Sequence, residues 1–287
     1  MEKDILSVLQ QGNAGFSKGQ RQIAKYIVDN YDKAAFMTAG RLGKAVGISE
    51  STVVRFAAEL GYDGYPAMRK AMQEMIRSRL TSVQRIEVAR QMIDERDIMK
   101  SVISADMDKL QVMLEELDQE SFDKTVDAII QAKNIYIVGM RTSTSLSSFL
   151  GQYLNLLREG VFVVRDTAAS EVFEQLLRIK QGDLFIGISF PRYSKHTVEA
   201  MMFARSRGAA TVGITDGPAS PFNGIADVDL YAKSDMVSFL DSLVAPMSLI
   251  NALIVAVGAR SSDHASDTFK QLENIWTEYD VYEHTDR

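Results

Sequence analysis

Two short segments of the chain combine hydroxyl groups with an arginine directly after an apolar run. "GMRTSTS" at 139–145 follows "NIYIV", and "SFPRYSKHT" at 189–197 follows "DLFIGI". Each segment could be a catalytic loop, a cradle for an anion, or a solvated turn. Hydroxyls and backbone N–H groups at a helix start bind phosphate oxygens, and the helix dipole adds to that binding. The candidate ligand-binding residues are Arg141, Thr142, Ser143, Ser145, Ser189, Arg192, Ser194 and Thr197.

The catalytic interpretation lacks the residues that it needs. Histidine occurs only at 196, 264 and 284, and the chain has no cysteine. We find no His/Glu pair, no metal-ligand spacing such as HExxH, and no glycine spacing typical of a P-loop or a dinucleotide fingerprint. We therefore expect no catalytic residues, no metal and no cofactor.

The segments around these loops alternate between short β-rich runs and stretches of helical period. The expected strands are 134–139, 161–164, 183–189, 210–215 and 227–232. Such alternation predicts a five-stranded parallel sheet with helices on both faces, an α/β three-layer sandwich. Ligands in these folds bind beyond the carboxyl ends of the strands. The sequence therefore places both loops at one edge of the sheet.

The first eighty residues have helical period and no convincing strand. Ser17 can cap a helix that carries Ile23, Ile27 and Tyr31 on one face. Thr38 can cap a second helix that runs through Val46. Gly47 permits a tight turn, and Ser49 can cap a third helix that ends at Gly61. Two short helices joined by such a turn form an all-α helix-turn-helix.

The expected helix after Ser49 has a polar face and an apolar face. Val53, Ala57 and Leu60 lie on the inner side, and Glu59 shares the outer side with three candidate DNA contacts. Arg55 can donate to guanine, and Ser51 or Thr52 to bases or phosphate. Lys18, Arg21, Lys44 and Tyr62 are expected backbone contacts. An ordinary amphipathic hairpin, or a module that docks a protein, is the alternative.

Charge and hydropathy support a basic head on an acidic body. Residues 1–80 hold 12 Lys and Arg against 8 Asp and Glu, a net of +4, whereas the whole chain has −6. A basic head favours a polyanionic partner. The uncharged run 242–259 contains Pro246 and Asn251, so we expect a core or subunit-interface helix and no membrane contact. The N-terminus does not resemble a signal peptide, and the expected location is cytoplasmic.

"FMTAGRLGKAVGISESTVVRFAAELGY" at 36–62 closely resembles the N-terminal domain of RpiR/MurR-type bacterial transcriptional regulators. Gly43 departs from the alanine that is usual in that family. The resemblance implies that the helix after Ser49 is the recognition helix, and it adds Thr38 and Ser49 to the DNA-binding residues. The residues that match the family pattern are Thr38, Leu42, Gly47, Ser49, Thr52, Val53, Arg55, Phe56, Leu60 and Gly61.

Residues 125–265 resemble the sugar isomerase (SIS) domain, a phosphosugar-binding α/β sandwich. That resemblance implies phosphate contacts from Ser143, Ser189 and Ser194, with Thr197 nearby. Arg141 stands where glycine is usual, and Pro191–Arg192 where Ser and Gly are common. An arginine could donate to a phosphate or a carboxylate, fill the sugar space, or pair with an acid of another subunit.

Together the resemblances imply a helix-turn-helix domain at 1–78, a helical linker at 79–106 and a SIS domain at 107–287. This is the architecture of a transcriptional regulator that senses a phosphorylated sugar and is not an enzyme. We expect a homodimer or homotetramer on a near-palindromic double-stranded operator. The alternative is a sugar-phosphate isomerase with a helical appendage.

Overall fold

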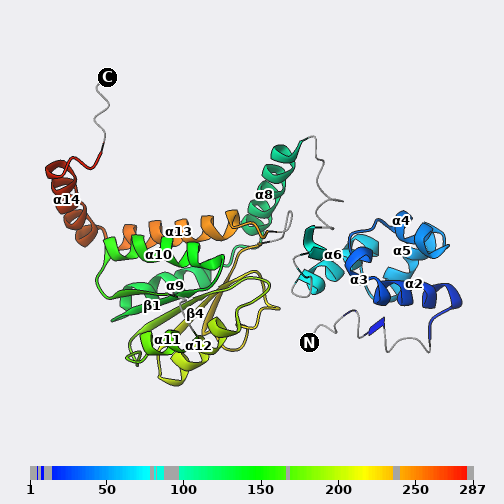
Figure 1. The fold of residues 1–287 in the computed structure, drawn as a ribbon, viewed down its shortest axis with the longest axis horizontal. Coiled ribbons are helices and arrows are strands. Elements are labelled where there is room, and N and C mark those ends of the chain that lie inside the picture. The colour runs from blue at the N-terminus through cyan, green and yellow to red at the C-terminus, as the bar shows by residue number, and fades with distance from the viewer. Residues whose placement is uncertain are drawn as a thin grey trace. The chain divides into compact units, whose positions relative to one another are not determined.

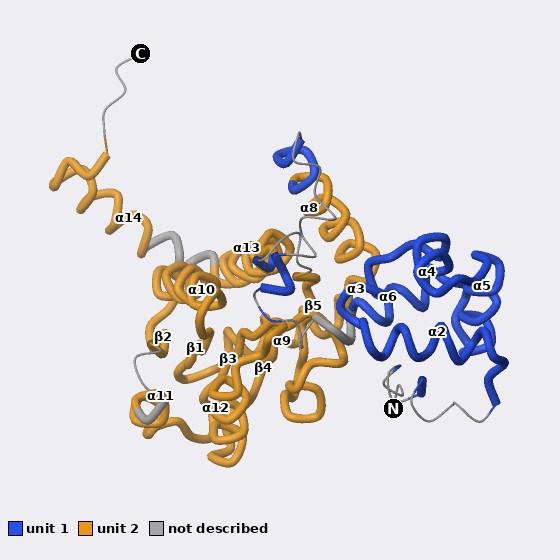
Figure 2. The backbone as a smooth tube through the Cα atoms, turned by 45° about the vertical axis from the view of Figure 1, so that its right-hand side comes forward, with its two compact units in different colours: residues 1–102, 236–241 blue, residues 103–235, 242–287 orange. Residues whose placement is uncertain are grey.

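The computed structural model describes residues 5, 8–9, 15–77, 81, 83–86, 97–165, 169–234 and 240–282. The chain divides into two compact units, residues 1–102 with 236–241 and residues 103–235 with 242–287 (Figure 2). The predicted junction between 78 and 79 lies outside the described residues. The domain boundaries at 78/79 and 106/107 therefore stay predictions.

The first unit is helical throughout its described core (Figure 1). Its apolar centre includes Ile23, Ile27, Leu42, Val53 and Phe56, each with no exposed surface. The inward positions expected for Ile23, Ile27 and Val53 are confirmed. Tyr31, expected on the same helix face as Ile27, instead begins a separate short helix and is partly buried. The helices of this unit are α2 (Lys18–Asp29), α3 (Tyr31–Ala34), α4 (Ala39–Val46), α5 (Glu50–Glu59) and α6 (Gly64–Arg77).

Local capping explains where α2 and α4 begin. Ser17 Oγ accepts from the Gln20 backbone N–H at 3.4 Å, and Gln20 Oε1 accepts from the Ser17 N–H at 2.7 Å. Thr38 Oγ1 accepts from the Arg41 N–H at 3.3 Å. Gly47 ends α4 with φ of 76°. Side-chain oxygens thus satisfy backbone donors that have no partner within the helix.

Gly43 brings the helix-turn-helix turn unusually close to α4. A Cβ at this position would lie 2.5 Å from the Ile48 carbonyl oxygen, which is inside van der Waals contact. The same backbone region is held by an Ile48 N–H donation to the Gly43 carbonyl at 2.8 Å. An alanine at 43 would require this turn to open, so the glycine fits the tighter turn of this chain.

The second unit is built on a five-stranded sheet of order β2–β1–β3–β4–β5, and every neighbouring pair is parallel. The predicted sheet is confirmed. Each expected strand lies within one residue of the observed one. The strands are β1 (Ile135–Gly139), β2 (Val161–Val164), β3 (Leu184–Ile188), β4 (Ala210–Thr215) and β5 (Val228–Tyr231).

Helices cover both faces of this sheet (Figure 1). Ile135 and Ile137 of β1 pack toward α9, α10 and α13, while Tyr136 and Val138 pack toward α11 and α12. This alternation follows from the period of two in a strand. The helices are α8 (Ile98–Glu115), which begins in the first unit, α9 (Gln119–Gln131), α10 (Ser143–Leu157), α11 (Ala169–Gln175), α12 (Lys195–Ser206), α13 (Val244–Arg260) and α14 (Ser262–Glu278).

Helix α13 accounts for the long uncharged run of the sequence. Leu249, Leu253 and Val257 are buried in the core, whereas Val255 is 70% exposed. The run is therefore a core helix with one free face. In the parts of the chain that the structure describes, no helix is long and apolar enough to cross a membrane.

Candidate functional sites

The outer face of α5 carries a connected group of hydroxyls. Ser49 Oγ lies 3.0 Å from Ser51 Oγ and 2.8 Å from Thr52 Oγ1, and Arg55 Nη2 donates to Thr52 Oγ1 at 3.4 Å. Ser49 holds the N-cap position, but its side chain makes no capping bond to the backbone. The expectation of a Ser49 side-chain cap is thus wrong, because its hydroxyl pairs with neighbouring hydroxyls. This face presents polar groups and one guanidinium at the start of the helix.

The remaining predicted DNA contacts lie on elements packed against α5. Lys18, Arg21 and Lys44 are exposed, and Tyr62 is partly buried against the helical core. A Cβ on Gly19 would lie 3.4 Å from Ile48 Cδ1, so the start of α2 borders the turn between α4 and α5. The structure therefore brings the start of α2, which carries Lys18, close to the turn that precedes α5.

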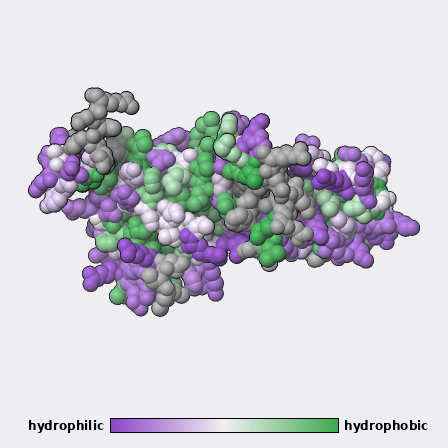
Figure 3. Space-filling view, turned by 45° about the horizontal axis from the view of Figure 1, so that its top comes forward, coloured by the Kyte–Doolittle hydropathy of each residue, from purple (hydrophilic) through white to green (hydrophobic). Residues whose placement is uncertain are grey.

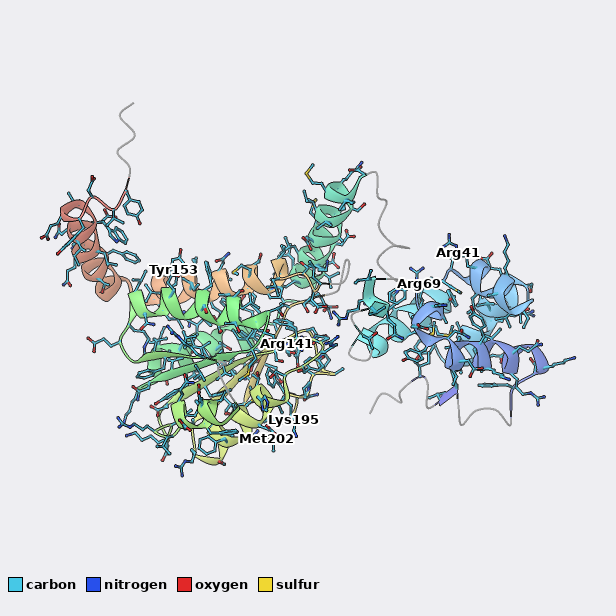
Figure 4. The ribbon with its side chains drawn as sticks, viewed as in Figure 1. Arg41, Arg69, Arg141, Tyr153, Lys195 and Met202 are labelled. Carbon is cyan, nitrogen blue, oxygen red and sulfur yellow. The ribbon has the colours of Figure 1, made fainter. Side chains whose placement is uncertain are left out.

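Two features of this face were not identified from the sequence. Arg41 is exposed in the first turn of α4 and extends away from the helices (Figure 4). The sequence signal for Arg41 was its place in the first turn of the helix that Thr38 caps. Glu59 accepts a hydrogen bond from Gln20 Nε2, which links α5 to α2. Only the fold brings Gln20 and Glu59 together, because they are 39 residues apart.

The second candidate site lies where the order of the strands reverses. Strands β1 and β3 are neighbours, yet α10 leaves β1 toward one face and α12 leaves β3 toward the other. A crevice at the carboxyl ends of the strands forms at such a switch point and is the usual ligand position in open α/β sheets. The segments 139–145 and 189–197 border this point, as expected.

The first turn of α12 is a small network of hydroxyls. Ser189 Oγ accepts from the Ser194 N–H at 3.0 Å, and Ser194 Oγ accepts from the Thr197 N–H at 3.3 Å. Ser189 is 3% exposed and Thr197 has no exposed surface. Thr197 Oγ1 is buried and makes no hydrogen bond among the described residues. A serine oxygen that accepts from the backbone still has its own proton to donate. The turn thus keeps hydroxyl donors for a ligand.

The start of α10 is tightly wound around Gly139. A Cβ at this residue would lie 2.5 Å from the Ser143 carbonyl oxygen, and Thr144 Oγ1 donates to the Gly139 carbonyl at 3.0 Å. Ser143 is 4% exposed, whereas Thr142 and Ser145 are exposed. Ser143 is therefore buried just after the carboxyl end of β1, whereas Thr142 and Ser145 are exposed there. Thr144 shapes the loop, a role that the sequence did not indicate.

A tyrosine–aspartate pair adds polar groups to the same edge. Tyr193 OH donates to Asp216 Oδ1 at 2.8 Å, and Asp216 directly follows β4. Thr215 Oγ1 also donates to Asp216 Oδ1, at 3.3 Å. Arg192 is exposed beside the buried Pro191. The sequence suggested a role for neither Tyr193 nor Asp216, because their contact joins two different strand ends.

The expectation that no His/Glu pair exists is wrong. His196 Nδ1 lies 3.4 Å from Glu199 Oε2 on α12, and Lys195 Nζ lies 3.4 Å from Glu199 Oε1. The helix brings these groups together because they are three and four residues apart. The His196 and Glu199 side chains are 47% and 38% exposed, as is typical of a surface pair. Within the described residues, no three His, Asp or Glu side chains gather into a group that could hold a metal ion.

Family models match two separate parts of the chain. The model described as "Helix-turn-helix domain, rpiR family" matches residues 3–79, and the model described as "SIS domain" matches residues 128–256. The first contains α2 to α6. The second contains all five strands and most of α13.

Similar proteins share this arrangement. An uncharacterized HTH-type transcriptional regulator of Caldanaerobacter subterraneus is 24% identical over 94% of this chain and 95% of its own length. The HTH-type transcriptional regulator HexR of Pseudomonas aeruginosa is 24% identical over 90% of each chain.

Two solved structures have the same fold. The sugar isomerase domain of an RpiR transcription factor from Sphaerobacter thermophilus is 29% identical, with a TM-score of 0.59, over 62% of this chain and 99% of its own. The Vibrio vulnificus NanR protein, solved in complex with ManNAc-6P, is 23% identical, with a TM-score of 0.59, over 96% of this chain and 98% of its own.

Proposed function

This chain belongs to the RpiR family of helix-turn-helix transcriptional regulators with a SIS domain, and we propose that it binds operator DNA under the control of a phosphorylated sugar. The face around α5 binds DNA, and the crevice between β1 and β3 binds the sugar phosphate. The named relatives are transcriptional regulators, and NanR was solved with a phosphorylated sugar. These relatives support both halves of the proposal.

The proposed binding of a sugar phosphate rests mainly on the hydroxyl network at the start of α12. Ser189 and Ser194 use their oxygens to accept backbone N–H groups, which leaves their protons to donate to an anion. A helix N-terminus adds backbone donors and a favourable dipole for phosphate. Ser143 approaches from the neighbouring loop. Together they suit a phosphate at the carboxyl edge of the sheet.

The proposed binding of operator DNA rests on the exposed face of α5. In helix-turn-helix proteins the first residues of the recognition helix reach base edges in the major groove. Ser51, Thr52 and Arg55 hold this position, and Lys18, Arg21 and Lys44 supply charge for the phosphate backbone. Thr38, Ser49 and Tyr62 complete the proposed contact set. Paired copies would place two such helices on a near-palindromic operator.

A selection experiment tests the proposed DNA binding through α5. The full chain should retain specific fragments from a genomic library, with an affinity that falls steeply as salt rises. Arg55→Ala should reduce the specific affinity at least about tenfold, since one good base contact contributes about 1–3 kcal/mol. Arg178→Ala, which removes an exposed arginine from the other unit, is the matched control. Equal losses in both variants, or no retained DNA, would contradict the assignment of α5.

A sugar-phosphate isomerase remains the second candidate, and the His196–Glu199 pair is the observation that favours it. An isomerase needs a general base near the reacting carbons, and an imidazole beside a carboxylate can act as one. We expect no interconversion of aldose and ketose phosphates when the full chain is incubated with them and followed by NMR. Turnover that His196→Ala abolishes would establish the enzyme instead.

A further inference from the structure

Arg141 adopts a backbone conformation that arginine rarely takes. Its φ of 57° is in the left-handed region, and among the described non-glycine residues only Asp280 shares a positive φ. Such positions cost free energy for residues with a Cβ and persist mainly where function maintains them. Arg141 holds this conformation between the end of β1 and the start of α10, at the crevice of the proposed function.

The charge of Arg141 serves no visible purpose within the fold. Its side chain is exposed and makes no ion pair or hydrogen bond among the described residues. Some arginines of the second unit have structural roles: Arg158 donates to carbonyls at the end of α9, and Arg260 bonds Asp123 and Asp127. Arg141 is therefore not needed to hold the structure together. Its guanidinium is available to a ligand.

The acids Asp216, after β4, and Glu199, on α12, have partners of their own. Asp216 already accepts the Tyr193 hydroxyl, and Glu199 lies beside Lys195 and His196. Figure 4 places Arg141 and Lys195 at the same end of the second unit, where α10 and α12 begin. An anion that enters the crevice thus meets a cation with five fixed donors on the β1 side.

The phosphate does not require Arg141. The start of α12 offers neutral donors from Ser189, Ser194 and the backbone, and Thr197 Oγ1 is buried there without a partner. Arg141 belongs to the other loop, and its long side chain reaches well beyond the spacing of about 4.8 Å between neighbouring strands. A guanidinium binds a carboxylate through two parallel hydrogen bonds. The arrangement suits two separate anionic groups on one ligand.

We propose that the ligand of this crevice is a phosphorylated sugar acid, whose phosphate lies at the start of α12 and whose carboxylate is bound by Arg141. This inference rests on the proposed function and narrows its ligand class. Arg141 is then the residue that distinguishes an acid from the corresponding neutral sugar phosphate.

Matched ligand pairs test the proposal by calorimetry on the full chain. One pair is gluconate 6-phosphate and glucitol 6-phosphate, and the other is 3-phosphoglycerate and glycerol 3-phosphate. The members of a pair differ by one carboxylate. Wild-type protein should bind the acid of at least one pair about tenfold or more tightly, as a charge-assisted bidentate contact allows.

Two variants remove the guanidinium without disturbing the loop. Arg141→Asn and Arg141→Gly both tolerate a positive φ, so the fold should be retained. Both variants should bind the acid about tenfold more weakly and leave the affinity for the neutral partner unchanged. Arg165→Ala, which removes an exposed cation after β2, is the control for the general electrostatic field and should preserve the preference.

The outcomes separate this inference from the proposed function. Equal weakening of acid and neutral ligand in the Arg141 variants would place the arginine on the phosphate and overturn the inference. If wild-type protein did not prefer the acid in either pair, the inference would be overturned as well. Binding of ManNAc-6P or of another neutral sugar phosphate in that case would leave the proposed function standing. Failure of every sugar phosphate to bind would overturn both.

Discussion

Ser189 and Ser194 show why the chemistry of single residues depends on their hydrogen bonds. Ser189 follows β3 and Ser194 is the N-cap of α12, and a solvated turn would fit their sequence equally well. Their oxygens, however, accept backbone N–H groups at 3.0 and 3.3 Å. The sequence could predict the hydroxyls and their position after a strand. The Tyr193–Asp216 and His196–Glu199 contacts were not predicted, because the first joins separate strand ends and the second depends on side-chain conformation.

Asp229 on β5 is a residue whose ionisation should affect stability. Its Oδ1 is buried without a hydrogen bond among the described residues, and burial raises the pKa of the carboxyl to about 6. The folded state therefore holds this proton more tightly than the unfolded chain, whose aspartates have a pKa near 3.9. The contribution of Asp229 to stability is largest below about pH 4 and is lost as the pH rises through about 6.

Asp229→Asn should consequently stabilise the second unit above pH 7 and change little at pH 4. The measurement is the thermal unfolding midpoint of variant and wild type across this pH range. Asp108→Asn, at an exposed position of α8, is the control and should follow wild type at every pH. A midpoint of the Asp229 variant below that of wild type at pH 8 would contradict the buried, unpartnered carboxyl.

At the scale of elements, the helices and strands were predictable because their signals are local. Thr38 and Ser17 cap where the sequence places them, and the period of two in β1 assigns its residues to the two layers. Contacts between distant segments carry no such signal. The ion pair of Arg85 Nη1 with Asp241 Oδ1, at 2.9 Å, joins residues 156 positions apart. No pattern within either segment indicates it.

Arg85→Leu should therefore weaken the first unit substantially. The two side chains are only 5% and 18% exposed, so the variant removes the arginine partner of a mostly buried carboxylate. Removal of one partner from a buried ion pair costs about 3–5 kcal/mol. Urea unfolding of the full chain should show this loss, and the double variant Arg85→Leu/Asp241→Leu should recover part of it.

The exposed pair Glu120–Lys124 supplies the comparison for this measurement. Its side chains are 78% and 59% exposed, and such pairs contribute little to stability. Lys124→Ala should leave the unfolding transition unchanged. If Arg85→Leu were no more harmful than Lys124→Ala, the ion pair would not hold residues 83–86 and 240–241 together in solution.

At the scale of the whole molecule, apolar side chains gather on the helical layer formed by α8, α10 and α13 (Figure 3). Met107 and Leu114 of α8 are each 63% exposed, and Val255 of α13 is 70% exposed. Apolar area of this kind is typical of an interface between subunits. A second copy is the occupant that the proposed function requires, because recognition helices act in pairs on a palindromic operator.

Met107→Glu should shift the full chain toward monomer, since it introduces a charge into an apolar interface. Analytical ultracentrifugation at micromolar concentration measures the shift. Leu177→Glu is the matched control, because Leu177 is 64% exposed and follows α11 on the opposite face of the sheet. Equal association of both variants and wild type would exclude this layer as the interface.

A phosphorylated ligand in the crevice should change the affinity of the protein for DNA, and one coupling measurement tests this directly. Operator affinity of the full chain is measured by fluorescence anisotropy with and without the sugar phosphate that the calorimetry identifies. We expect a change of about 5-fold or more in wild type and in the control Ser206→Ala, a typical allosteric coupling. Ser189→Ala should keep its DNA affinity without ligand and show little or no change when ligand is added. An unaltered ligand response in Ser189→Ala would contradict control of DNA binding through this crevice.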